Sequence, residues 1–296
     1  MTTTQLTALL RQHKIVPLDG AWGTELARLG LPAGDVPETW NLSQAEKVAE
    51  VPRAYADAGA RIVLTNTFGG SRIKLEKAGL GGSVREINEA GARISRQAVS
   101  GAAFVFASVG PTGEFLEPLG SITAAQMTEV FEEQIRALVA GGADGIVVET
   151  MTDIEEAVCG LRAARRVAPE KPVAVSLTFD KGAQGYATMM GVTPRAAAER
   201  LKAEGADIIG TNCGNGIETM IEIVAELRAH TATPLWARPN AGMPQLVDGR
   251  TVFPESAEAM ARKVPRLAAA GAVLIGGCCG TTPGHIAAMI AALSAR

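Results

Sequence analysis

Three cysteines stand where apolar runs end, and their spacing could hold a metal ion. Cys278 and Cys279 are adjacent within AVLIGGCCGTTP, and Cys213 ends a similar run within ADIIGTNCGNG. Successive side chains of a regular strand face opposite sides, so both adjacent thiols can face one ion only if the strand has ended and the backbone turns. The flanking glycines permit such a turn. Three thiolates with one position left open are typical of a catalytic zinc site, because zinc is the usual ion for thiolate ligands.

A cysteine can also be a small buried apolar residue, and this is our interpretation of Cys159, which lies within EEAVCGLRAAR on a predicted helix. A disulfide between Cys278 and Cys279 would close a strained ring, and nothing in the sequence indicates an oxidising compartment. For the other three cysteines, the repeated position at the end of a strand favours metal binding.

Composition excludes several other classes of function. The 296 residues are 47% hydrophobic, which suffices for one large core, and the formal net charge is -3 without a basic stripe, so nucleic acid is not an expected partner. No run reaches the ~18 apolar residues of a membrane span. The opening MTTTQLTALLRQHK is typical of a short helix rather than of a signal peptide. We expect one cytoplasmic domain over 1–296 with reduced thiols; the oligomeric state is not indicated.

These cysteines must be positioned by a repeating unit in which a helix ends at glycine and an apolar strand follows. The unit is clearest in DAGARIVLTNTF, GGADGIVVET, AEGADIIGTN and AAGAVLIGG. Strands are predicted at 15–18, 62–65, 104–108, 146–149, 173–177, 208–211, 235–237 and 272–276. Helices are predicted at 43–58, 84–100, 124–140, 154–167, 194–204, 217–230, 256–270 and 283–294, and Ser43, Asp153 and Thr193 are candidate caps. The alternation predicts an α/β fold, a single-domain (β/α)8 TIM barrel. An open doubly wound sheet is the alternative, but its GxGxxG turn is missing after the first strand.

In such a barrel the functional site lies at the carboxyl ends of the strands. Asp19 and Glu149 end the first and fourth strands, while Thr67, Ser108 and Asn240 follow the second, third and seventh. A buried acid is costly without a charge partner. One ammonium group of a substrate could satisfy both Asp19 and Glu149; alternatively, each acid caps a helix.

Seven motifs carry a family likeness: LDGAWGTEL, AGARIVLTNTF, SVGPTG, GIVVETMTD, GTNCGNG, ARPNAGMP and LIGGCCGTTPGHI. They span nearly the whole chain, and the sequence resembles the homocysteine S-methyltransferase family. This family includes the homocysteine module of cobalamin-dependent methionine synthase and the betaine- and S-methylmethionine-dependent enzymes. The pairing of GGCCGT with a distant NCG is the most specific of the matches. The resemblance implies a zinc-containing (β/α)8 barrel that methylates the sulfur of homocysteine to give methionine.

The resemblance also implies roles for single residues. It assigns Zn(2+) to Cys213, Cys278 and Cys279, and it places the ammonium group of homocysteine near Asp19 and Glu149. It assigns the carboxylate of homocysteine to backbone amides of the loop formed by Ala21, Trp22, Gly23 and Thr24, and we expect Thr67, Ser108 and Asn240 to complete the substrate site. Three thiolates keep zinc less Lewis-acidic than a histidine-rich set, which suits a nucleophilic sulfur better than activation of water.

The methyl donor is left open by the sequence: a methylcorrinoid or methylfolate delivered by a partner protein, or a small donor. Betaine and sulfonium donors are cationic, and aromatic rings recognise such centres. Trp22, Trp40, Phe68 and Phe115 are candidates for this recognition, and Trp40 could instead anchor the first helix in the core. Against betaine, TNTFGGS carries two glycines where betaine enzymes carry an aromatic residue, and TNTFGGSRIKLEKAGL is closer to the methionine-synthase module.

Two functions of other classes are the alternatives. A barrel aldolase or isomerase could bind phosphate at Gly276 and Gly277, but it would need a Schiff-base lysine, and no predicted strand ends in one. A non-catalytic partner module would hold a structural zinc with four protein ligands. The three histidines, His13, His230 and His285, all lie on predicted helices, away from the strand ends.

Overall fold

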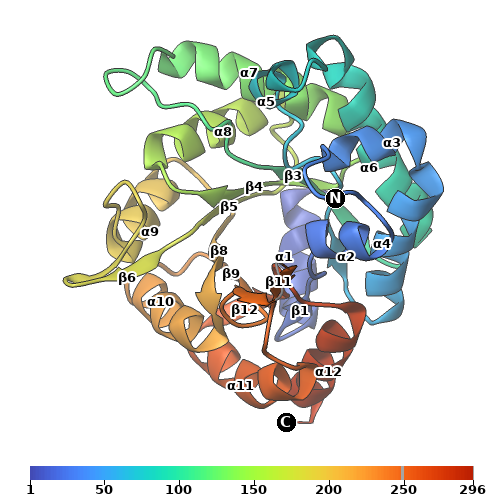
Figure 1. The fold of residues 1–296 in the computed structure, drawn as a ribbon. Coiled ribbons are helices and arrows are strands. Elements are labelled where there is room, and N and C mark those ends of the chain that lie inside the picture. The colour runs from blue at the N-terminus through green and yellow to red at the C-terminus, as the bar shows by residue number, and fades with distance from the viewer. Residues whose placement is uncertain (248–249, 296) are drawn as a thin grey trace.

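Eight parallel strands form one sheet in the order β1-β12-β9-β8-β5-β4-β3-β2 (Figure 1). They are β1 (Val16–Pro17), β2 (Ile62–Val63), β3 (Phe104–Val109), β4 (Gly145–Met151), β5 (Val173–Leu177), β8 (Ile208–Gly216), β9 (Leu235–Asn240) and β12 (Ala272–Ile275). The structure is a computed structural model and describes residues 1–247 and 250–295. A bridge between Leu18 and Ile62 joins the two ends of the sheet, and the Asp19 amide donates to Ile62 O at 3.0 Å. The predicted (β/α)8 barrel is therefore confirmed.

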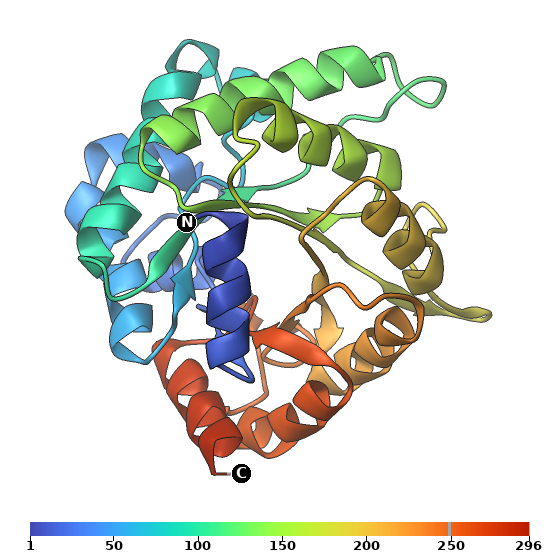
Figure 2. The ribbon, with the colours of Figure 1, turned by 180° about the vertical axis from the view of Figure 1, so that it is seen from behind.

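The eight predicted helices surround the strands (Figure 2). They are α4 (Ala45–Asp57), α6 (Val84–Val99), α7 (Ala124–Ala140), α8 (Ile154–Val167), α9 (Pro194–Ala203), α10 (Ile217–His230), α11 (Ala257–Ala269) and α12 (Pro283–Ser294). Asp153 and Thr193 cap α8 and α9 as predicted, accepting from the amides of residues 155 and 196. The prediction for Ser43 was wrong, because Ser43 ends a separate short helix, α3 (Trp40–Ser43). Over the described ranges, 1–247 and 250–295, no helix combines the length and apolar character needed to cross a bilayer.

The interior of the barrel is filled by side chains, not left as a channel. Phe106 of β3 and Trp236 of β9 stack with their ring centroids 6.1 Å apart, and both are fully buried. Helix α1 (Thr3–Gln12) adds Leu6 to this cluster and covers the amino end of the strands (Figure 2). A stacked aromatic pair contributes roughly 0.5–1.5 kcal/mol beyond the apolar area it buries. The closed amino end leaves the carboxyl ends of the strands as the open face.

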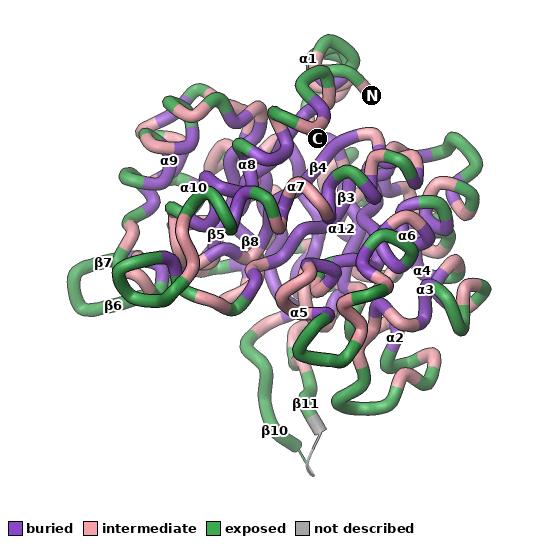
Figure 3. The backbone as a smooth tube through the Cα atoms, turned by 90° about the horizontal axis from the view of Figure 1, so that it is seen from above, coloured by how far each residue is buried: buried purple, intermediate pink, exposed green. Residues whose placement is uncertain are grey.

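Several short elements that sequence reasoning missed lie in the connections after the strands. They are α2 (Gly23–Arg28), α3, α5 (Arg72–Lys77), the 3-10 turns at Pro37–Thr39 and Gly81–Ser83, and two hairpins, β6 (Asp180–Gly182) with β7 (Gly185–Ala187) and β10 (Gln245–Val247) with β11 (Arg250–Val252). The buried layers lie at the centre of the molecule, and β10 and β11 project away from it (Figure 3). These connections wall the open face of the barrel, where function is expected.

Candidate active site

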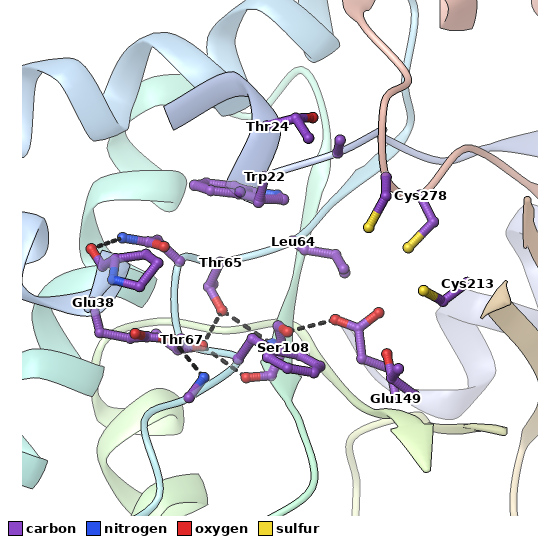
Figure 4. Close-up of a pocket in the computed structure, with 18 of the residues that line it drawn as sticks. Trp22, Thr24, Glu38, Leu64, Thr65, Thr67, Ser108, Glu149, Cys213 and Cys278 are labelled. Carbon is purple, nitrogen blue, oxygen red and sulfur yellow. Dashed lines mark hydrogen bonds between the residues drawn. The ribbon is translucent and has the colours of Figure 1, made fainter. Parts of the chain in front are cut away.

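The sulfur atoms of Cys213, Cys278 and Cys279 lie within 4.8 Å of one another. The three thiols that were predicted to converge are thus brought together from β8 and from the turn that follows β12, since β12 ends at Ile275. In Figure 4 the sulfurs of Cys213 and Cys278 point into the same space. Cys159, in contrast, is buried on α8, and its sulfur donates to a backbone oxygen at 3.5 Å.

The turn that carries Cys278 and Cys279 is tied to the ends of both neighbouring strands. The Cys278 amide donates to Pro239 O at 2.8 Å, near the end of β9. The Gly277 amide donates to Asp19 O at 3.0 Å, beyond β1. These bonds satisfy backbone groups that lie past the end of the ladder, and they fix where the two thiols point.

Two glycines make this turn possible. A Cβ at position 276 would lie 2.4 Å from Asp19 O, so only glycine lets the two chains approach this closely. Gly280 has φ +80°, and a Cβ there would lie 2.2 Å from Cγ of Phe253. Glycine adopts this left-handed region at no steric cost. The GGCCG pattern is therefore explained by backbone geometry as well as by the thiols.

Cys213 reaches the cluster through an irregular strand end. The register between β8 and β9 shifts between Asn212 and Gly216, and Cys213 has φ +63°, in the left-handed region. Thr150, after Glu149 on β4, also has a positive φ, +62°. Non-glycine residues in this region store strain and tend to occur at functional sites. Bulges of this kind re-aim side chains.

The three thiols lie close enough to form hydrogen bonds with one another, and these bonds change their pKa values. The S–H groups of Cys278 and Cys279 lower the pKa of Cys213 to about 3, and the same contacts raise the pKa of Cys279 well above its ordinary value. The two neighbouring S–H groups thus favour ionisation of Cys213 over the other two thiols, and a cation would be needed for all three sulfurs to ionise together. Beside Gly214, the side-chain oxygen of Asn240 is buried and has no partner among the described residues, while its nitrogen donates to Gly214 O at 2.7 Å. Three soft donors with an unpaired oxygen nearby fit a bound metal ion.

Arg238 lies between the two acids that were predicted to share a substrate ammonium group. Its Nη2 donates to Asp19 Oδ1 at 2.8 Å and its Nη1 to Glu149 Oε2 at 3.1 Å. It also donates to Gly277 O at 2.9 Å and to Gly20 O at 2.8 Å. The sequence analysis did not identify this charge partner for the two acids within the chain. Arg238 lies within the ARPNAGMP motif, but its pairing with Asp19 across 219 positions has no local sequence signal.

The two acids differ in what else they contact. Asp19 is fully buried, does not line the cavity described below, and accepts from Trp22 Nε1 and from the Leu64 amide, both at 2.8 Å. Glu149 faces the cavity and accepts from Ser108 Oγ at 2.5 Å. Burial raises the pKa of Glu149 to about 7 despite the opposing effect of Arg238 and Ser108. Neither acid caps a helix, because Asp153 caps α8 and α2 has no side-chain cap.

One cavity of about 690 Å³ opens beside the thiols (Figure 4). Of the residues predicted from the sequence, it is lined by Ala21, Trp22, Gly23, Thr24, Thr67, Ser108, Glu149, Cys213, Cys278 and Cys279, but not by Asp19 or Asn240. Within the 21–24 loop, the Ala21 amide already donates to Thr281 Oγ1 at 3.1 Å. The Thr24 hydroxyl is buried without a partner in the described chain, so it has unused hydrogen-bonding capacity.

The cavity is also lined by Glu38 and Lys74, which sequence reasoning did not single out. Glu38 is buried and accepts from the Gly69 amide at 2.5 Å. Lys74 places its ammonium group 5.0 Å from the ring centroid of Phe68. Among the four aromatic candidates, Trp22 and Phe68 line the cavity; Trp40 is packed in the core and Phe115 is at the surface, and neither lines it.

Comparison with known proteins agrees with this geometry. The family model for homocysteine S-methyltransferase matches residues 16–293. The methionine synthase of Mycobacterium tuberculosis is 32% identical over 311 aligned residues, which cover 98% of this chain and 25% of that protein, and the methionine synthase of Mycobacterium leprae matches to the same extent. The chain thus spans about a quarter of the length of these curated relatives.

Among solved structures, the metallated form of the homocysteine methyltransferase MmuM from Escherichia coli superposes with a TM-score of 0.82 at 26% identity. The match covers 97% of this chain and 99% of that one. The family match over residues 16–293 includes the three clustered cysteines and the strands β8 and β12. The chain belongs to the homocysteine S-methyltransferase family.

Proposed function

We propose that this protein is a zinc-dependent methyltransferase that transfers a methyl group to the thiolate of homocysteine and forms methionine. The observation that carries the proposal is the convergence of Cys213, Cys278 and Cys279 at the wall of a cavity that also contains Glu149. Three thiolates favour zinc and leave one tetrahedral position for a further ligand. When bound, zinc would lower the pKa of the acceptor thiol and keep its sulfur nucleophilic.

The chain's own residues would orient the acceptor. Glu149 presents a carboxylate to the cavity, and Ser108 fixes its direction by donating to Oε1. The Thr24 hydroxyl and the first amides of α2 are free to receive the acceptor's carboxylate. Trp22, held by its bond to Asp19, covers the same cavity and limits access of water. Asp19 would act through Arg238 and Trp22, since it does not line the cavity.

The cavity is large enough for more than the acceptor, because sites of 300–1,000 Å³ bind drug-sized molecules. We propose that the donor is a methylcorrinoid or methylfolate delivered by a partner protein. Two features support this. The Lys74 ammonium group covers Phe68 and would repel a cationic methyl donor. The glycines at 69 and 70 provide no second ring for a cage.

A small donor, betaine or S-methylmethionine, is the second candidate. It is favoured by the aromatic ring of Trp22, which lines the same cavity as the three thiols. Trp22 would then be the ring that contacts the cationic centre.

A donor screen tests these proposals. Purified zinc-loaded protein and homocysteine are combined separately with methylcobalamin, methyltetrahydrofolate, betaine and S-methylmethionine, and methionine is measured. We expect methionine with methylcobalamin or methyltetrahydrofolate, and none from Cys278→Ala. If methionine forms with betaine or S-methylmethionine but not with methylcobalamin or methyltetrahydrofolate, the result supports the second candidate. No methionine with any donor, while zinc and homocysteine bind, contradicts both.

A further inference from the structure

The cavity in which homocysteine would bind, here called the acceptor pocket, already contains a positive charge of the protein. The Arg238 guanidinium lies where the ammonium group of the substrate was expected. A ligand ammonium group that bridges Asp19 and Glu149 must lie between their facing oxygens. The Arg238 guanidinium occupies that position, 2.8 Å from Asp19 Oδ1 and 3.1 Å from Glu149 Oε2. Its side chain is 3% exposed, so solvent screens this charge weakly.

Arg238 is held too firmly to give way to a ligand. Its Nε donates to Gly277 O, and its Nη2 donates to Gly20 O as well as to Asp19. With the bond to Glu149, four of the five guanidinium N–H groups have acceptors. The guanidinium carbon also lies 5.9 Å from the ring centroid of Trp236. Displacing the guanidinium would leave a buried charge and two backbone oxygens without partners.

Asp19 has little capacity left for a ligand. Its two carboxylate oxygens already accept from Arg238, from Trp22 Nε1 and from the Leu64 amide. Of the two acids, Glu149 alone lines the cavity, and its Oε2 accepts from Arg238 while its Oε1 accepts from Ser108. An ammonium group that approaches Glu149 is therefore attracted by the carboxylate and repelled by a fixed guanidinium beside it. The net attraction then offsets little of the free energy needed to remove the ammonium group from water.

We propose that Arg238 determines the acceptor specificity of this site, taking the place of the substrate's ammonium group between Asp19 and Glu149. Short ω-mercapto carboxylic acids that lack an amino group then bind about as well as homocysteine. Sulfur and carboxylate carry the recognition, and the amino group adds little. This inference rests on the proposed function, because it concerns the same acceptor site.

Two thiols that differ only in the amino group test the inference. Homocysteine and 4-mercaptobutanoate share the thiol, the carboxylate and the chain length. Each is titrated into zinc-loaded protein by calorimetry, which measures the Kd independently of any methyl donor. We expect the two Kd values to agree within about fivefold. Homocysteine binding more tightly by a larger factor overturns the inference.

The variant Arg238→Gln gives the complementary measurement. With the guanidinium removed, both acids face an ammonium group, and we expect the preference for homocysteine to rise by at least about tenfold. Arg228→Gln, on α10 and away from the cavity, should leave both Kd values unchanged. A folded Arg238→Gln protein with wild-type preference overturns the inference; if that variant does not fold, the wild-type comparison decides alone. If neither thiol binds the wild-type protein, the proposed function itself fails, and the inference fails with it.

Discussion

The Asn212 side chain is hydrogen-bonded to both the backbone and the side chain of Thr150, across the open end of the barrel. Its oxygen accepts from the Thr150 amide at 3.0 Å and from Ser176 Oγ at 2.6 Å, and its nitrogen donates to Thr150 Oγ1 at 2.7 Å. Thr150 follows Glu149, and Asn212 precedes Cys213. One amide side chain thus positions both the acid that faces the acceptor and one of the three sulfurs.

Replacing Asn212 should affect metal binding as well as stability. Asn212→Ala removes these three hydrogen bonds and a longer one to Cys278 Sγ at 4.0 Å, beside two residues with positive φ, and we expect a loss of about 1–3 kcal/mol in the free energy of unfolding. We also expect weaker zinc binding, measured by competition with a chelator. Asn88→Ala is the control, because Asn88 is equally buried and hydrogen-bonded but is remote from the sulfurs. Unchanged zinc affinity in Asn212→Ala would contradict the positioning role.

The three clustered cysteines should each be required for the metal. Cys278→Ala leaves two sulfurs, and we expect it to lose most of the zinc that the wild-type protein retains after dialysis. Cys159→Ala should keep its zinc, since Cys159 lies outside the cluster. Metal analysis of the purified proteins provides the measurement. Full zinc content in Cys278→Ala would refute the assignment.

Removing the charge of Glu149 should weaken homocysteine binding but not zinc binding. Glu149→Gln leaves Arg238 to repel the substrate's ammonium group, and we expect the Kd for homocysteine to rise by about tenfold. The Kd for 4-mercaptobutanoate, which has no ammonium group, should not rise. Glu156→Gln is the matched control, because Glu156 is also buried but binds Thr112 outside the cavity. A homocysteine Kd within about twofold of wild type would show that Glu149 does not contact the ammonium group.

Asp144 should make stability depend on pH in the acid range. Burial acts to raise its pKa, but hydrogen bonds from Arg96 and the Val105 amide outweigh burial, and the pKa of Asp144 lies below its ordinary value. Its contribution is present above the unfolded pKa, about 3.9, and is lost as pH falls through the lower folded pKa. Asp144→Asn should therefore be less stable than wild type at pH 7, and the difference should shrink below about pH 4.

Urea denaturation at several pH values provides that measurement. The exposed Asp57, changed to asparagine, is the control and should alter stability little. A stability difference for Asp144→Asn that is constant down to the acid limit would contradict the assignment.

The sequence predicted those features that local residue patterns determine. Continuous apolar runs located all eight strands. Two of these runs end close to Cys213 and Cys278, and this located the sulfur cluster. The hairpins β6–β7 and β10–β11 escaped prediction because they are short, largely exposed and lack such runs. The pairing of Arg238 with Asp19 could not be derived, since it depends on closure of the barrel and not on neighbouring residues.

The seam between β1 and β2 gives Asp19 a second role. These two strands are the shortest in the sheet and are joined by one bridge. The Asp19 side chain accepts a hydrogen bond from the Leu64 amide, at the place where the next bond between the strands would lie. The same carboxylate anchors Arg238. We therefore expect thermal opening of this seam to release the guanidinium, and amide exchange at Leu64 should report how often the pocket for the acceptor opens. Any redesign of acceptor preference at Arg238 also changes how tightly the barrel is closed.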